Sequence, residues 1–340
     1  MLGPSATEKF FSALYFFVLR PIRKISARVA IVPYFVFGVL LMNNTIPAIS
    51  LRTWGVSDIG RVRNNNEDSY LMVDLTTGAP LTQEVPAPSS GFLLMVADGM
   101  GGHEAGEVAS RMAVETVSQY VSLSLAGSRF PSRRRFVDIL RKAIFEANTA
   151  IYDASHADEN CQGMGTTLTA AGVYDGAAFF AQVGDSRAYV LRTNTVARMT
   201  EDQNLATKLA AAGTEPLDQS AAAPYQNVLL QALGAEPQVS VPVSFLELRR
   251  GDWIVVCSDG LTNLVGDEEI RDMLWHAENP QVACHTLVET ANARGGRDNI
   301  TVIAAYCNGP SLPVPQAHER LDAQAFVHPW WYRFVRFLGY

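Results

Sequence analysis

Residues 92–110 read FLLMVADGMGGHEAGEVAS, which combines an apolar run, a glycine-rich turn and a helical pattern. The first six residues are all apolar, which predicts a short strand buried on both faces. The strand ends at Asp98, a glycine-rich turn follows, and residues 104–121 then show helical periodicity. A carboxylate at the end of a buried strand, beside glycines that let backbone approach closely, suits a metal ion or a phosphate. The alternative is a tight turn with a solvated Asp, and this motif alone leaves both interpretations open.

The composition indicates a chain with a large core and an acidic body. Of the 340 residues, 48% are hydrophobic and 18% are charged, and the formal net charge is −7. This balance argues against nucleic acid as the main partner and is compatible with a cation-binding site. The cysteines are far apart and form no CxxC pair, which favours reduced thiols in a cytoplasmic protein over two disulfides. They are Cys161, Cys257, Cys284 and Cys307.

The N-terminal segment, residues 1–50, differs from the body because it is apolar and basic. Its two apolar runs, 10–19 and 29–42, are shorter than the roughly 18 residues that a membrane-spanning helix needs. No clean small-x-small site follows them, as a cleaved signal peptide would require. We therefore expect a peripheral segment at a membrane surface. A second interpretation is that Met42 is the natural start and that residues 1–41 are absent from the native protein.

The next segment combines an arginine with carboxylates at a turn. Residues 51–58 predict a strand, the turn RVRNNNEDS follows, and a strand resumes at 70–73. Arg63 offers a planar fork that binds phosphate or carboxylate bidentately, and Glu67 offers hard oxygen for a divalent cation or its water shell. The alternative is a solvated hairpin end with a surface ion pair.

Further elements follow in order along the chain. Residues 76–91 read as an exposed loop, 131–152 as an amphipathic helix and 163–192 as consecutive antiparallel strands, with Asp185 at a turn. Residues 200–238 lack a strong period and resemble an insertion over the surface, of the kind that gates a site. A buried strand, 253–257, then ends at Asp259, two helices follow at 267–275 and 281–292, and Asp298 precedes a strand at 300–306.

The carboxylates at these strand ends are predicted to converge. Asp98 and Asp259 close strands, whereas Asp298 opens one, and in antiparallel packing the end of one strand lies beside the start of its neighbour. Asp185 lies at a turn on the same edge. Several carboxylates in a small site raise one another's pKa unless cations bind, and an all-oxygen set favours Mg²⁺ or Mn²⁺. Two such ions can activate a water for phosphoester hydrolysis. The alternative is that these Asp residues only stabilise their turns by hydrogen bonding to the backbone.

Six motifs in order resemble the metal-dependent type 2C protein Ser/Thr phosphatases, most closely the compact bacterial ones. The motifs are RVRNNNEDS, VADGMGGHEAGEVAS, GMGTT, VGDSRAYV, CSDGL and GRDNITV. The resemblance covers residues 51–308, with the flap at 200–238, and leaves 309–340 as a linker and aromatic-basic tail. It implies an α+β fold, a four-layer α/β/β/α sandwich of two antiparallel sheets flanked by helices.

The resemblance also implies a role for each candidate residue. Asp98 would bridge two Mn²⁺ or Mg²⁺ ions, with the Gly99 carbonyl on the first and Asp259 and Asp298 on the second. Glu67 would act through metal-bound water, and Arg63 would bind the substrate phosphate. Asp185 would join Asp259 in a third, weaker metal site.

Two features depart from the family pattern. Met100 stands where some members carry a His proposed as the general acid, and His103 lies three residues further on. The flap reads APYQNVLLQALG where many bacterial members have His-Pro and Arg, so the flap's substrate contacts are not carried over. The tail, FVHPWWYRFVRFLGY, suits either a membrane interface, a partner groove or packing against the domain.

The resemblance implies a monomeric, cytoplasmic enzyme that dephosphorylates phosphoserine and phosphothreonine in proteins and opposes their Ser/Thr kinase. A catalytically silent binding module on the same fold is the alternative class. The complete acidic set favours the enzyme, since inactive relatives usually lose a metal carboxylate. Membrane contact through the two termini is a further expectation.

Overall fold

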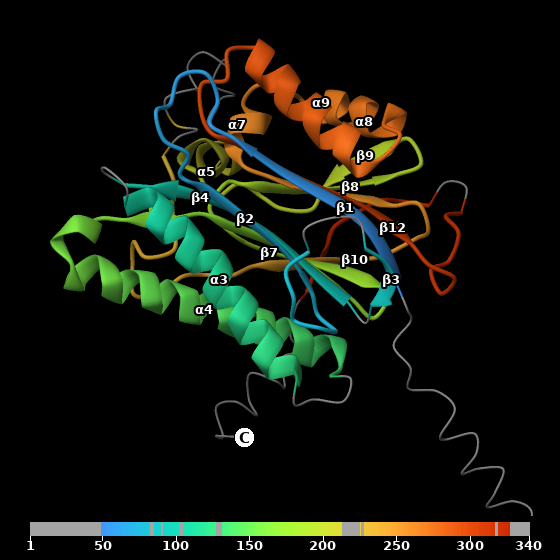
Figure 1. The fold of residues 1–340 in the computed structure, drawn as a ribbon, viewed down its shortest axis with the longest axis horizontal. Helices are drawn as coiled ribbons and strands as arrows, with labels where there is room; N and C mark the ends of the chain where they lie inside the picture. The colour runs from blue at the N-terminus through green and yellow to red at the C-terminus, as the bar shows by residue number, and fades with distance from the viewer. Residues whose placement is uncertain are drawn as a thin grey trace, which may run out of the picture. The chain divides into compact units, whose positions relative to one another are not determined.

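The strand that carries Asp98 lies inside one of two stacked antiparallel sheets (Figure 1). The computed structural model describes residues 49–81, 85–89, 91–101, 105–126, 131–212, 225, 228–316 and 319–326. All of these belong to one compact unit, Ile46–Tyr340. Residues 1–48, His103 and residues 327–340 of the C-terminal tail lie outside the described residues. The first strand, β1 (Ile49–Asp58), includes the last two residues of the predicted N-terminal segment.

The first sheet has six strands. Their spatial order is β3 (Val85–Ser89), β1 (Ile49–Asp58), β12 (Ile300–Asn308), β11 (Trp253–Cys257), β8 (Arg187–Arg192) and β9 (Thr195–Arg198). The second sheet runs in the order β13 (Gln324–Ala325), β10 (Val243–Glu247), β7 (Ala177–Val183), β6 (Leu168–Tyr174), β4 (Gly91–Met100) and β2 (Asp68–Asp74), with β5 (Gly165–Thr166) paired to β4. Each of these strand pairs is antiparallel.

Helices cover the outer face of each sheet, so the layers are α/β/β/α as predicted (Figure 1). α3 (Ala105–Ala126) and α4 (Arg133–Ala157) pack on the second sheet. The short α7 (Asp259–Thr262) joins α8 (Asp267–His276) and α9 (Pro280–Ala293) against the first. A 3₁₀ turn, Glu159–Cys161, follows α4, and α5 (Leu205–Ala211) lies in the predicted flap. None of the described helices is long and apolar enough to cross a bilayer.

The alternation of side chains along β4 explains why its sequence is apolar throughout. Phe92, Leu94 and Val96 pack in the core between the sheets. The intervening Leu93, Met95 and Ala97 pack beneath α3 and α4. Both faces of the strand are therefore buried, which fixes its register and the position of Asp98 at its end.

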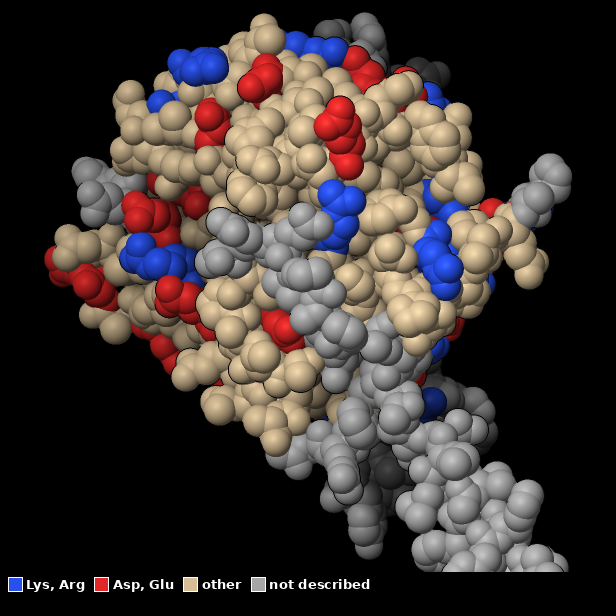
Figure 2. Space-filling view, turned by 45° about the vertical axis from the view of Figure 1, so that its right-hand side comes forward, with Lys and Arg blue, Asp and Glu red and all other residues tan. Residues whose placement is uncertain are grey.

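One segment differs from expectation, and a second follows one of the interpretations left open for the tail. The predicted loop 76–91 contains β3, whose two prolines are tolerated because β3 lies at the edge of its sheet. Residues beyond 308 also contribute to the packing: β13 pairs with β10, and Phe326 packs against Phe179 and Phe245. All four cysteines are free thiols. On the face drawn in Figure 2, acidic and basic side chains are scattered among uncharged ones.

Candidate active site

The strand-end carboxylates meet at one end of the two sheets. β11 and β12 are antiparallel with Cys257 opposite Val302, so Asp259, just after β11, and Asp298, just before β12, lie at the same end. Asp98 lies at the end of β4 in the facing sheet. A cavity of about 650 Å³ opens there. Its lining includes all seven residues predicted from the sequence: Arg63, Glu67, Asp98, Gly99, Asp185, Asp259 and Asp298.

Backbone and hydroxyl hydrogen bonds fix Asp98. Its N–H donates to Thr167 Oγ1 at 3.0 Å, and its carbonyl accepts from Thr167 N–H at 2.8 Å and from Thr166 Oγ1 at 2.9 Å. The next N–H, that of Gly99, donates to the Glu67 carbonyl at 3.1 Å. The carboxylate of Asp98 is thereby left to face the cavity while its backbone is held from both sides.

Gly99 can only be glycine. A Cβ at this position would lie 2.1 Å from the Gly106 carbonyl oxygen and 2.5 Å from that of Glu67. We expect Gly99→Ala to destabilise the fold by about 1–3 kcal/mol, because backbone atoms of two elements must separate. Denaturant unfolding measures this. The control is Gly266→Ala, whose nearest neighbour is a flexible Glu269 oxygen at 3.6 Å. Equal stabilities for the two variants would contradict the close-packing argument.

The turn between β1 and β2 is tied to the start of β12. Asn299 Oδ1 accepts the Glu67 N–H at 2.8 Å, and Asn299 Nδ2 donates to the Ile59 and Asn65 carbonyls at 3.0 and 2.9 Å. Arg63 Nη2 donates to Asp298 Oδ2 at 2.8 Å, and the Arg63 side chain is 51% exposed. The Arg63 guanidinium therefore lies at the cavity, and only one of its five N–H donors is used in the contact with Asp298.

Burial and mutual repulsion raise the pKa values of the clustered acids. Burial, followed by the charges of Asp68 and Asp259, raises the pKa of Asp98 well above its usual range. Burial first and the Asp259 charge second raise the pKa of Asp185 to about 7. For Asp259 the causes of a raised pKa are burial and then the Asp298 charge. The site therefore disfavours free carboxylates and favours whatever brings positive charge to them.

The oxygen atoms that line the cavity are of the chemical type that binds divalent cations. Asp259 Oδ1 is buried and has no hydrogen-bond partner among the described residues, so its lone pairs are available to a ligand. The described cavity lining contributes carboxylate and carbonyl oxygens and neither His nor Cys, which is the set that Mg²⁺ and Mn²⁺ prefer. As they stand, no three Asp, Glu, His or Cys side chains of the described residues converge closely enough to hold one ion. Part of the reason is that Asp298 is turned to Arg63.

Asp185 lies at the β7–β8 turn, beside the start of the flap. Gln203 N–H donates to the Gly184 carbonyl at 3.0 Å, and Gly184 N–H donates back to Gln203 Oε1 at 2.9 Å. Arg187 donates to both carboxylate oxygens of Asp202, at 2.7 Å from Nη2 and 3.0 Å from Nε. This pair is largely buried, so the described start of the flap is anchored to the turn that carries Asp185.

We expect Asp202→Asn to loosen this anchor. One partner of a mostly buried charge pair is lost, so stability should fall by about 1–3 kcal/mol. Denaturant unfolding measures this. The control is Glu247→Gln, which removes a partner of Arg133 in a more exposed ion pair and should cost less. Equal stabilities for Asp202→Asn and the control would contradict the anchoring role.

Sequence reasoning missed three contributors to the site. Asp68 pairs in register with Asp98, and burial raises its pKa to about 7, while Ser258 Oγ donates to it at 2.8 Å. Thr167 and Asn299 hold Asp98 and Glu67 by the contacts above. Asp68 and Asn299 are adjacent to predicted residues in the chain, but only the strand register reveals their roles.

Comparison with known proteins gives one consistent family. A family profile described as protein phosphatase 2C matches residues 85–293, more than half of the chain. The serine/threonine phosphatase stp of Listeria welshimeri is 36% identical over 252 residues, which are 74% of this chain and 94% of that protein. Protein phosphatase PhpP of Streptococcus pneumoniae is 30% identical over 253 residues, covering 74% of this chain and 96% of the relative.

The solved structures that are similar to this chain belong to the same class of phosphatase. The serine/threonine phosphatase PstP/Ppp of Mycobacterium tuberculosis superposes with a TM-score of 0.63 at 32% identity, covering 76% of this chain and 98% of the other. A PstP catalytic domain in complex with two manganese ions gives a TM-score of 0.62 at 31% identity, covering 76% and 99%. The sandwich predicted from the six motifs is confirmed.

Proposed function

Since this chain belongs to the protein phosphatase 2C family and is a protein serine/threonine phosphatase, we propose that the cavity at Asp98 is its active site. The observation that carries the proposal is that all seven residues predicted from the sequence line that one cavity. The substrate class is phosphoserine and phosphothreonine in proteins. The cavity is wide enough for a phosphorylated side chain. Residues 228–231, near the C-terminal end of the flap, line it.

We propose that Arg63 receives the phosphate. A guanidinium offers two parallel N–H donors to two oxygens of one phosphate, which binds it and sets its orientation. The Arg63 pKa is raised chiefly by its hydrogen bond to Asp298, so it stays charged throughout the working pH range. An arriving phosphate competes with Asp298 for this guanidinium, and Asp298 is then released to other partners.

The acidic residues are proposed to hold two Mn²⁺ ions, the metal pair in the structure of the PstP relative. Asp98, Gly99, Asp259 and Asp298 are the proposed direct ligands, and Glu67 the proposed partner of coordinated water. When bound, the ions supply an activated water and positive charge against the phosphate. Met100, at the position where some family members carry a His, has no proton to give, so the leaving group is proposed to take its proton from water.

A third ion is a proposal that rests on Asp185, whereas Mg²⁺ in place of Mn²⁺ is a proposal that rests on the all-oxygen donor set. The buried Asp185 carboxyl faces the charge of Asp259, which a third cation between them would offset. We expect Asp185→Asn to keep most of the turnover at saturating Mn²⁺ and to raise the Mn²⁺ concentration for half-maximal activity about tenfold. A Mn²⁺ titration of activity measures this. An unshifted titration curve would contradict the third site.

The proposed context is a monomer in the cytoplasm that opposes a Ser/Thr kinase, with the terminal segments at a membrane surface. The basic, apolar N-terminal segment is the sequence feature that supports membrane contact. Cosedimentation of the full chain with vesicles of anionic lipid tests it, since a chain that stays in the supernatant has no such contact.

Phosphopeptides test the substrate class. The metal-loaded chain should release phosphate from phosphothreonine and phosphoserine peptides much faster than from a phosphotyrosine peptide of the same sequence. The measurement is inorganic phosphate against time at matched concentrations. If the folded, Mn²⁺-loaded protein binds these peptides without hydrolysing them, the silent binding module is the better description.

A further inference from the structure

A second cavity, of about 460 Å³, lies at the opposite end of β11 and β12 from the active site. Trp253 opens β11, whereas Asp259 follows its other end, and Tyr306 lies near the end of β12 that is remote from Asp298. Two rigid, buried strands therefore separate the two cavities. Nothing proposed so far for the phosphatase reaction uses this second cavity.

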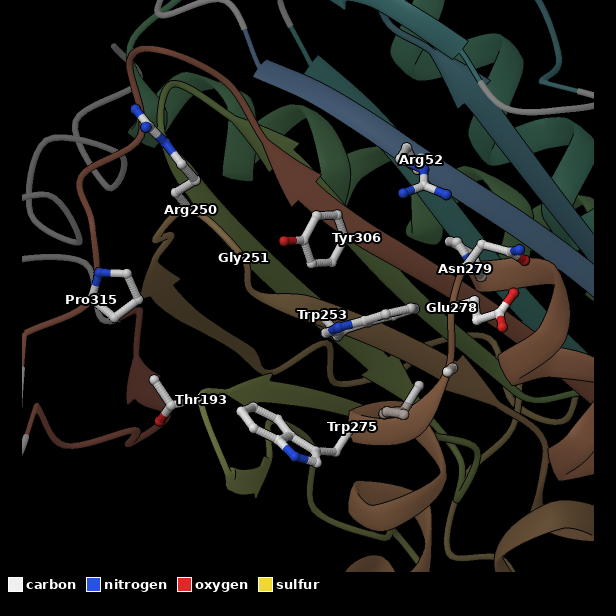
Figure 3. A pocket seen from close by; sticks show the side chains of 13 residues that line it. Arg52, Thr193, Arg250, Gly251, Trp253, Trp275, Glu278, Asn279, Tyr306 and Pro315 are labelled. Carbon is white, nitrogen blue, oxygen red and sulfur yellow. The ribbon is translucent and has the colours of Figure 1, made fainter.

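Aromatic side chains form the middle of the cavity (Figure 3). The rings of Trp253 and Tyr306 meet edge to face with centroids 5.2 Å apart. Trp275 projects from α8 on the near side and is 53% exposed, which is unusual for so large an apolar surface. Trp253 is only 9% exposed and forms the floor with Tyr306, so the exposed ring of Trp275 provides the face on which a planar group can stack.

Arginines stand at both ends of this aromatic floor. Figure 3 shows Arg250 at one end and Arg52 at the other, with Trp253 and Tyr306 between them. Arg250 is held by its backbone N–H, which donates to the Pro313 carbonyl at 2.8 Å, and by long bonds from Nη2 to the Pro310 and Leu312 carbonyls. Glu278 is the one acid in the lining, so the described rim carries a net positive charge.

Polar atoms on the floor are available as well. Within the described part of the chain, neither the Tyr306 hydroxyl nor the Trp253 indole N–H has a hydrogen-bond partner. Gly251, beside Tyr306, would place a Cβ 3.6 Å from that hydroxyl, so its lack of a side chain keeps the hydroxyl accessible. The cavity thus offers an exposed aromatic face, neutral donors and the Arg250 guanidinium together.

We propose that this cavity binds a small anion that carries a planar ring, of the nucleoside monophosphate class. The base stacks on the exposed ring of Trp275 above the floor of Trp253 and Tyr306, and the phosphate pairs with the Arg250 guanidinium at the rim. The volume lies within the roughly 300–1,000 Å³ typical of small-molecule sites. A cationic ligand, which aromatic cages also bind, is opposed by the two arginines. The proposal is independent of the phosphatase activity.

Calorimetric titration of the full chain with AMP tests the proposal, with EDTA present to keep phosphate from the metal-dependent site. AMP should bind at least about tenfold more tightly than either adenosine or inorganic phosphate, because each of these lacks one of the two contacts. Trp275→Ala and Arg250→Gln should each weaken AMP binding about tenfold. The controls His276→Ala, also exposed on α8, and Arg111→Gln, on α3, should bind AMP as the wild type does.

Three outcomes would overturn the proposal. AMP binding no tighter than that of inorganic phosphate would remove the role of the rings. Binding that survives both Trp275→Ala and Arg250→Gln, or that is lost in Arg63→Ala, would place AMP elsewhere. Heat too small to measure at millimolar AMP would show that the cavity takes no such ligand. Phosphopeptide turnover by Trp275→Ala, expected to equal the wild type, keeps this test separate from the phosphatase assignment.

Discussion

Replacing Asp98 by Asn is expected to lower phosphopeptide turnover by on the order of a thousandfold, because several kcal/mol of metal-derived stabilisation is lost with the central ligand. The substitution keeps the size of the side chain and the backbone bonds to Thr166 and Thr167. The control is Asp153→Asn, an exposed carboxyl on α4, which should retain full turnover. Activity of Asp98→Asn within tenfold of the wild type would contradict the assignment.

The same substitution should stabilise the metal-free fold. Burial and neighbouring acids raise the pKa of Asp98, so ionisation is easier in the unfolded chain than in the folded one. The wild type therefore loses stability as pH rises above the ordinary Asp range toward that raised pKa, and Asn does not. Thermal unfolding in EDTA at pH 5 and pH 8 measures this. The Tm of Asp98→Asn should exceed that of the wild type by more at pH 8 than at pH 5. Each kcal/mol of relative stabilisation should raise the Tm by about 2–4 °C.

Arg63→Ala is expected to lower kcat/KM for a phosphothreonine peptide by at least about a hundredfold, since two charge-assisted hydrogen bonds of about 1.5–3 kcal/mol each are lost. Arg63→Lys should recover part of this, because an ammonium keeps the charge but not the fork. Arg111→Ala is a matched control, since both arginine side chains are 51% exposed and each pairs with one acid. A decrease of less than about threefold in Arg63→Ala would assign phosphate binding to other groups.

The sequence predicts most of the fold because the pattern of burial is local. β4 and β11 are short apolar runs ended by an Asp, and α4 carries an apolar stripe that is buried as expected. β3 was missed because its prolines indicate a loop, and only pairing at the sheet edge with β1 makes it a strand. β13 has two exposed residues and no pattern of its own, so its pairing with β10 depends on the rest of the fold.

The site residues also divide into those that local sequence patterns predict and those whose roles depend on long-range strand pairing. Residues at strand ends could be found from the sequence because antiparallel pairing places their ends together. Asp68 could not be assigned a role, since its effect on Asp98 arises from the register of β2 against β4. The contact between Arg63 and Asp298 joins residues 235 positions apart and follows from the pairing of β1 with β12. The register between strands that are distant in the sequence therefore could not be predicted from the sequence pattern.

The two-metal site at Asp98 can be tested by equilibrium dialysis against Mn²⁺, paired with phosphate release from a phosphothreonine peptide. We expect two tightly bound Mn²⁺ ions per wild-type chain, as in the PstP relative, with activity that follows their occupancy and is lost in EDTA. We also expect Asp98→Asn to lose both the ions and the activity. Phosphate release that persists in excess EDTA, or two tightly bound ions in Asp98→Asn, would contradict the two-metal site at Asp98.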